Sequence, residues 1–292
     1  MNRKMIFLAI TVLAIVSLAC SVNINLPSTQ VKTGPTVTED ISVPLPSGTG
    51  TTMDVILNFG GGTLDLQPGA QDALVEGTAS YNIADFKPTV TVDTNSATIA
   101  QGNLDLGGIP SFTKDIVNEW VLKLGNTPIN LEINAGAYEG TFDLGGLSIQ
   151  SLEFNDGAAK VTVSFSTPNL VEMSSLDYTT GASDVSLKGL ANANPKEMTF
   201  SSGAGNYTLD FSGELRNNMN VNIESGVSQV TIIIPEGTNA QVITDSGLMT
   251  VSTSGGWQQN GNTYQLSGTG NTITLHVEMG AGSLKLETSR GG

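Results

Sequence analysis

The sequence predicts an all-β protein, built as a stacked, solenoid-like array that follows an N-terminal β subdomain. A short phrase recurs five times: a glycine, a small residue and then a strand of alternating polar and apolar residues. Its glycines are Gly136, Gly157, Gly181, Gly203 and Gly226, separated by 21, 24, 22 and 23 residues. A regular period of this kind is typical of repeat architectures. The 34 glycines and 13% charged residues also suit short strands and tight turns.

Each repeat is predicted to carry two strands joined at the glycine. In the second repeat, alternation places Val161, Val163 and Phe165 on one face and Thr162 on the other. A shift of one residue would reverse the two faces, so the glycine turn must fix the register. We expect the glycines to serve there because glycine accepts a positive φ. Related glycine phrases occur at 60–62 and 280–282, and the last of these lies in a predicted cap that covers the end of the stack.

The first 19 residues are predicted to be a lipoprotein signal peptide. Arg3 and Lys4 precede an apolar run that is too short to span a bilayer, and small residues lead to Cys20, the only cysteine. Cys20 is therefore the predicted lipidation site, and its acyl chains would anchor the protein to a membrane. Ser17 stands where leucine is usual, and the alternative is a secreted protein or an uncleaved anchor whose cysteine is incidental. The protein is expected to be extracytoplasmic.

The rest of the chain is predicted to form three parts. Residues 20–48 are rich in Pro, Ser, Thr and Gly, and are expected to be a disordered tether behind the lipidated cysteine. Residues 49–115 are predicted to form the N-terminal β subdomain. Residues 116–292 are predicted to form the stacked β-repeat domain with its C-terminal cap.

The charge of the chain excludes some partners. With 27 acidic and 12 basic residues, the formal net charge is −15. An acidic surface repels nucleic acid and anionic lipid headgroups, so we expect neither as a partner. A single cysteine allows neither an intrachain disulfide nor a thiolate metal cluster.

Few residues suggest chemistry, and for each a structural role is the favoured interpretation. Asp65, Asp105, Asp143 and Asp210 recur in one phrase and could form a carboxylate ladder for Ca²⁺, or could simply be outward-facing strand residues. His276 is the only histidine, and alternation predicts that it lies on a polar surface.

Trp120 and Trp257 could stack on carbohydrate, but packing at a boundary or cap is favoured. A glycosidase needs a pair of carboxylates that the sequence does not single out. We therefore expect no enzymatic activity and no cofactor.

Several phrases resemble the bacterial toast-rack family. They are Asn118–Trp120, Ile133–Ala137, Gly189–Asn194 and Gly203–Gly213, with Ala73–Tyr81 resembling the N-terminal β domain of that family. The family includes surface lipoproteins and proteins described as adhesins, and resembles the C-terminal domains of cell-wall-active antibiotic response proteins. The resemblance implies a stacked β fold and supplies no catalytic motif.

The expected function is thus that of a lipid-anchored, adhesin-like structural or interaction module of the cell envelope. One alternative is an envelope-stress sensor or adaptor that binds a membrane signalling partner, although the chain lacks a predicted transmembrane signalling segment. Another is a polysaccharide-binding protein. The expected partners are the membrane, through the N-terminal lipid, and an envelope protein, a glycan or a second copy.

Overall fold

The structure is a computed structural model that describes residues 28–48, 50–103, 109–112 and 115–290. The predicted signal peptide, the predicted lipidation site Cys20 and Asp105, one of the four recurring aspartates, lie outside the described residues. Within the described part of the chain, no helix has both the length and the apolar character needed to cross a membrane.

The chain divides into two compact units. The smaller unit contains a two-stranded parallel sheet, in which β1 (Ser28–Val31) pairs with β7 (Ile109–Phe112). The larger unit comprises Thr33–Leu104 and Ile116–Gly292, and its strands form one sheet of 15 strands. The all-β, solenoid-like prediction is confirmed.

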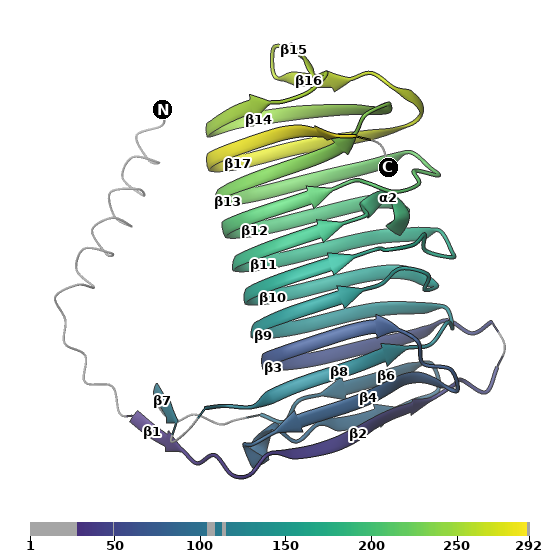
Figure 1. Cartoon of the computed structure of the whole chain (residues 1–292), viewed down its shortest axis with the longest axis vertical. Helices are drawn as coiled ribbons and strands as arrows, with labels where there is room; N and C mark the ends of the chain where they lie inside the picture. The colour runs from purple at the N-terminus through teal and green to yellow at the C-terminus, as the bar shows by residue number, and fades with distance from the viewer. Residues whose placement is uncertain (1–27, 49, 104–108, 113–114, 291–292) are drawn as a thin grey trace. The chain divides into compact units, whose positions relative to one another are not determined.

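Eight long strands form the rungs of the larger unit (Figure 1), and they pair in parallel in the order in which we give them. They are β3 (Met53–Pro68), β9 (Ile129–Asp143), β10 (Ile149–Ser164), β11 (Met173–Lys188), β12 (Pro195–Asp210), β13 (Met219–Pro235), β17 (Thr269–Ser289) and β14 (Thr238–Thr253).

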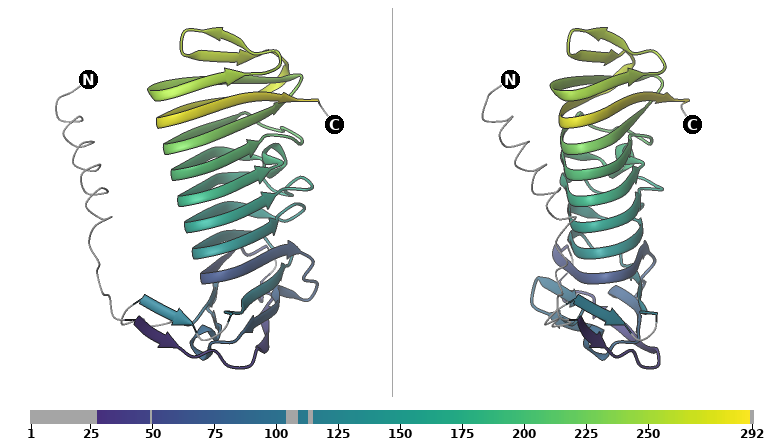
Figure 2. Two further views of the ribbon diagram at one scale, coloured as in Figure 1. Left: turned by 60° about the vertical axis from the view of Figure 1, so that its left-hand side comes forward. Right: turned by 90° about the vertical axis from the view of Figure 1, so that its left-hand side faces the viewer.

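Each rung is a single strand that doubles back along one edge of the stack, as Figures 1 and 2 show. We call the part before the bend the first limb and the part after it the second limb. The two strands predicted for each repeat are therefore the two limbs of one strand. The predicted boundary between the N-terminal subdomain and the repeat domain, at residues 115 and 116, does not divide the sheet. Strand β3, which lies before this boundary, pairs with β9, which lies after it, over Met53–Leu66.

The glycines at the bends form a ladder, but the predicted reason for them is wrong. The glycine row begins at Gly60 and passes through Gly136, Gly157, Gly181 and their equivalents to the last rung, and these residues do not have a positive φ. Glycine is instead required by close backbone approach between rungs. A Cβ on Gly136 would lie 2.2 Å from the Gly60 carbonyl oxygen, and one on Gly181 would lie 2.5 Å from the Gly157 carbonyl oxygen.

The core lies between the two layers of limbs. Val161, Val163 and Phe165 are buried, which confirms the predicted alternation. A row of aromatic rings runs through the core from Trp120 to Tyr207, with neighbouring centroids 4.9 to 6.4 Å apart. Rings from both limbs take part, since Phe142 of a second limb packs edge-on against Phe154 of a first limb at 5.2 Å. Such pairs add stability beyond their buried area.

Smaller strands close the N-terminal end of the stack. The first limb of β3 pairs with β6 (Ser96–Ala100), which pairs with β5 (Thr89–Val92). The second limb of β3 pairs with β8 (Asn118–Leu124), which pairs with β4 (Ala73–Tyr81). The short 3-10 helix η1 (Ala84–Phe86) follows β4.

The predicted disordered tether contains a strand. Residues Val37–Pro44 form β2, which pairs antiparallel with β4 and buries Ile41 and Val43. Their spacing is the period-two alternation of a strand. The surrounding Pro, Ser and Thr residues hid this signal in the sequence, so the tether prediction is wrong for this stretch.

The C-terminal end differs in order from the predicted cap. β17, the last strand in the sequence, lies between β13 and β14, so β14 is the final long rung. A hairpin of β15 (Gln258–Asn260) and β16 (Thr263–Leu266) continues the sheet beyond β14. A short helix, α2 (Leu190–Ala193), lies in the connection between β11 and β12.

Candidate interaction face

The outward side chains of the first limbs form a polar surface along the stack. Since side chains alternate along each strand and the rungs pair in parallel, the same outward positions align from rung to rung. One row, for example, contains Glu132, Glu153, Asp177, Thr199 and Asn222 in successive rungs. We call this surface the acidic face, for the charges that it carries.

Each of the eight rungs contributes one carboxylate to the acidic face. They are Asp54, Glu132, Glu153, Asp177, Glu197, Glu224, Glu278 and Asp245. These first limbs, which the structure describes in full, contain one basic residue, Lys196 at the start of β12, which is exposed and whose Nζ lies 2.7 Å from Oε1 of Glu172. The face therefore presents an excess of negative charge along the length of the stack.

Two groups of three carboxylates stand directly beside one another in consecutive rungs. Glu132, Glu153 and Asp177 form the first group, in one row. Glu224, Glu278 and Asp245 form the second group, in the neighbouring row. Neighbouring strands lie only about 4.8 Å apart, and like charges in such positions destabilise a sheet.

Members of each group line a shallow hollow. Glu132 and Glu153 of the first group lie with Asn130, Ser151 and Ile56 in a hollow of about 250 Å³. Asn222 and His276 lie beside the second, in a hollow of about 240 Å³. Both hollows lack a buried acid–base pair and are open polar surfaces suited to contact with the charged end of a partner side chain.

A ladder of asparagines holds the first group in place. Asn134 donates a hydrogen bond to Asn58 at 3.0 Å and another to Glu132 at 2.7 Å. Asn155 repeats this pattern, donating to Asn134 at 3.0 Å and to Glu153 at 2.9 Å. These amides orient two of the three carboxylates, which lowers the cost of ordering them when a partner binds.

The outward face of the second limbs is different, because it carries charges of both signs. Its carboxylates are Asp65, Glu139, Asp143, Asp184, Asp210 and Glu287, and its lysines are Lys160, Lys188 and Lys285. The two faces thus differ in their balance of charges: the second-limb face carries three lysines, whereas the first limbs contain only Lys196, which is paired with Glu172.

Asp65, Asp143 and Asp210 do not form a calcium ladder, which was the less favoured of the two interpretations, because the register does not bring these residues together. Asp65 pairs with Thr141, Asp143 with Ser164, and Asp210 with Ile233. Two of the carboxylates instead cap turns, since Asp143 accepts from the Ser166 hydroxyl at 2.8 Å and Asp210 from the Ser212 amide at 2.9 Å. Among the described residues, no group of three or more His, Cys, Asp or Glu side chains could hold a metal ion.

The single histidine and the two tryptophans occupy positions that fit structural roles. His276 is exposed on the acidic face, as predicted. Trp120 is fully buried against Phe59, with ring centroids 5.2 Å apart, and so offers no surface for a sugar. Trp257 is half-buried and packs against the core near the end of the stack.

One buried carboxylate was not predicted from the sequence. Asp156, next to the glycine row, is 8% exposed and accepts a hydrogen bond from the Tyr138 hydroxyl at 2.8 Å and a second from Tyr178. Burial raises the pKa of Asp156 to about 6, although both hydrogen bonds act to lower it. Burial, together with the Asp156 charge, raises the pKa of both tyrosines well above the usual value. The site is enclosed, so it is part of the core and not a place for substrate.

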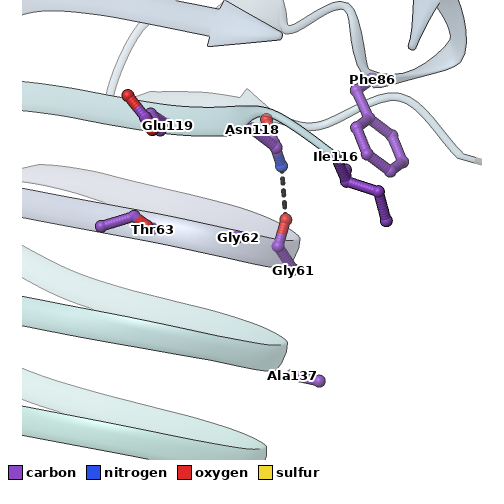
Figure 3. Close-up of a pocket in the computed structure, with 8 residues that line it drawn as sticks. All are labelled: Gly61, Gly62, Thr63, Phe86, Ile116, Asn118, Glu119 and Ala137. Atoms are coloured by element: carbon purple, nitrogen blue, oxygen red, sulfur yellow. Dashed lines mark hydrogen bonds between the residues drawn. The ribbon is translucent and has the colours of Figure 1, made fainter. Parts of the chain in front are cut away.

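A further hollow, of about 280 Å³, lies at the bend of β3 (Figure 3). It is lined by Gly61, Gly62, Thr63, Phe86, Ile116, Asn118, Glu119 and Ala137. Glu119 is the only ionisable residue in this lining, so it contains no acid–base pair. Figure 3 shows the Asn118 amide pointing to the Gly61 carbonyl oxygen, to which it donates at 2.6 Å.

This geometry defines the chain as a stacked β-rung protein whose most distinctive surface is an acidic face. The family described as the N-terminal domain of toast_rack, DUF2154, matches residues 32–174 and 168–233. The chain therefore belongs to the toast-rack family. A comparison with curated protein sequences gives no match.

Several solved structures resemble the chain. A protein from Clostridium sporogenes described as a "putative cell adhesion protein" is 23% identical, with a TM-score of 0.49, and the match covers 87% of this chain and 100% of the other. A "putative adhesin" from Bacteroides fragilis is 14% identical, with a TM-score of 0.42, 88% of this chain and 99% of the other. A "putative lipid binding protein" from Parabacteroides distasonis is 11% identical, with a TM-score of 0.37, 88% of this chain and 99% of the other.

Proposed function

We propose that the protein is a non-enzymatic, adhesin-like interaction module of the cell envelope, and that its acidic face binds a basic surface of an envelope protein. The observation that carries this proposal is the line of eight carboxylates, one per rung, in first limbs whose one basic residue, Lys196, is paired with Glu172. Complementary charge speeds encounter and sets specificity at protein interfaces.

The two groups of adjacent carboxylates strengthen the proposal. Their mutual repulsion costs stability, and places where a protein breaks a local rule of this kind are expected at functional sites.

A polysaccharide is a weaker candidate for the partner, because the fully buried Trp120 offers no stacking platform. An envelope-stress adaptor would use the same face for one stoichiometric membrane partner.

Attachment to the membrane through lipidated Cys20 is part of this proposal. It rests on the signal-like residues 1–19 and on Cys20 being the only cysteine. Metabolic labelling with a fatty acid tests it directly. Wild-type protein should carry the label, and the Cys20→Ser variant should not. Label in both proteins would show that the lipid is attached at another residue. Label in neither protein would contradict the proposed lipid anchor.

The binding role is tested with two charge-matched triple variants. One neutralises the acidic face (Glu132→Gln, Glu153→Gln and Asp177→Asn), and the control neutralises the opposite face (Asp65→Asn, Glu139→Gln and Asp184→Asn). Each removes three negative charges, so the net charge of the two variants is the same.

The measurement is binding to the envelope fraction of cells that lack the protein, over a series of salt concentrations. Exposed charges are screened over about 10 Å at 0.1 M salt, so wild-type binding should weaken as salt rises. The acidic-face variant should bind several-fold more weakly than the control at low salt. Equal binding by both variants would contradict the proposal.

A further inference from the structure

The last long rung of the stack is covered along only half of its length. β16 pairs with β14 over Ala240–Ile243, and the amide of Thr244 donates to the Asn262 carbonyl oxygen at 2.9 Å. The second limb of β14, Gly247–Thr253, pairs with β17 on its inner side. Among the described residues, no strand pairs with the outer side of this limb. An unpaired strand edge is a template for another strand.

The side chains of this limb are less buried than their equivalents in the interior of the stack. Val251 aligns with Leu284 and Val230, which are both fully buried, yet Val251 itself is only partly buried. Met249 is likewise partly buried, and Leu248 is 82% exposed. One further strand on the outer side of β14 would cover this end of the core.

The usual protection of a strand edge is missing here. Natural edges are guarded by charged side chains or proline. At the opposite end of the sheet, β2 carries Glu39, Asp40 and Pro44. From residue 246 to residue 275, the sequence contains no Asp, Glu, Lys or Arg, in a chain with a net charge of −15. Gly247–Thr253 also contains no proline.

From this arrangement we propose that the second limb of β14 is a docking site for one extended, uncharged strand of a partner protein, added by backbone pairing. Backbone hydrogen bonds supply affinity in this mode, and alternate side chains supply specificity. Apolar residues at every second position of the incoming strand would cover Met249 and Val251. A charged strand would lose hydration at this uncharged edge without gaining an opposite charge.

The fold favours a single strand over a second copy of the chain. The β15–β16 hairpin extends the sheet beyond the first limb of β14 (Figure 2), so a second stack could not approach the second limb closely. The chain enters the larger unit just before β2, at the opposite end of the sheet from β14.

A synthetic peptide tests the site. Its central sequence is that of residues 227–233, an uncharged part of the second limb of β13, which pairs with β17 in the stack. Two lysines at each end keep it soluble. The control peptide has the same sequence but carries N-methyl groups on alternate backbone nitrogens, so it keeps its side chains and charge and loses hydrogen-bond donors.

Amide hydrogen exchange of the full chain is measured with and without each peptide. We expect the unmodified peptide to slow exchange in residues 247–253 at least several-fold, and the methylated peptide to have little effect. Unchanged exchange there, equal protection by both peptides, or protection centred on β2 would overturn the proposal. So would protection that rises with protein concentration in the absence of peptide, because a second copy would then be the occupant.

Discussion

Close approach between rungs, and not an unusual backbone angle, decides which residue can stand at each bend. A methyl group on Gly181 would lie 2.5 Å from the Gly157 carbonyl oxygen, a distance that real Cβ atoms essentially never show. From Gly136 onward, a Cβ on each glycine of the row would meet the carbonyl oxygen of the preceding glycine in the same manner, at 2.2 to 2.9 Å. The spacing of the glycines was evident in the sequence, but their cause depends on contacts between residues more than 20 positions apart.

Gly181→Ala should therefore lower the free energy of unfolding by roughly 1–3 kcal/mol, the cost of overpacking a tight site. The matched control is Gly256→Ala, because a Cβ there would meet only the Leu266 side chain, at 3.4 Å. Thermal or denaturant unfolding measures both. A loss for Gly256→Ala as large as that for Gly181→Ala would refute the close-approach explanation.

Asp156 makes stability depend on pH. Its pKa in the folded protein is about 6, against a usual value of 3.8, so between these values the folded state holds a proton that the unfolded state has lost. The contribution of Asp156 to the free energy of unfolding therefore falls by about 3 kcal/mol as the pH rises from about 4 to 6. Above pH 6 this contribution stays low.

Asp156→Asn removes this charge and keeps a polar partner for the Tyr138 hydroxyl. Relative to wild type, the variant should gain stability at pH 8 and lose that gain at pH 4. Melting temperatures at the two pH values give the comparison, in which effects of the other carboxylates cancel. A difference between variant and wild type that does not change with pH would show that folding does not raise the pKa of Asp156.

Among the elements, the bend of β3 needs special support because no single strand continues beyond it. The limbs of β3 pair with two separate strands, β6 and β8, which leaves the backbone of the bend without a neighbouring rung. Gln101 fills this place by accepting hydrogen bonds from the Gly60 amide at 2.9 Å and the Asn118 side chain at 2.8 Å. Asn118 in turn donates to Gly61. Two side chains thus replace part of a missing strand.

Gln101→Ala should destabilise the protein by about 1–3 kcal/mol, because the Gly60 amide and the buried Asn118 side chain each lose a hydrogen-bond acceptor. Gln229→Ala is the control, since Gln229 is an exposed glutamine on the outward side of a rung. Denaturant unfolding of both variants measures the difference. Equal stability would mean that water replaces Gln101 at no cost.

The alternation of polar and apolar residues made the rungs predictable. Spacing alone indicates the buried face, as it does for Val161, Val163 and Phe165. The strand β2 was not predicted, because only two buried residues, Ile41 and Val43, stand among turn-forming residues. The position of β17 between β13 and β14 could not be read from the sequence either, since chain order does not determine which strand pairs with which.

On the scale of the whole molecule, the acidic face follows from the register of eight rungs. Each carboxylate is unremarkable in its own strand, and the face exists only because parallel pairing aligns the outward positions. The sequence therefore supplied the net charge of −15 but not its distribution. The opposite face, with Lys160, Lys188 and Lys285, is the natural internal control for any function of the acidic face.

Binding of a partner to the acidic face can be tested by site-specific photo-cross-linking in living cells. A photoreactive residue replaces either Asn222, exposed on the acidic face, or Gln229, exposed on the opposite face of the same strand. We predict a defined cross-linked envelope protein from position 222 and none from position 229. The same product from both positions, or a product from position 229 alone, would contradict the account.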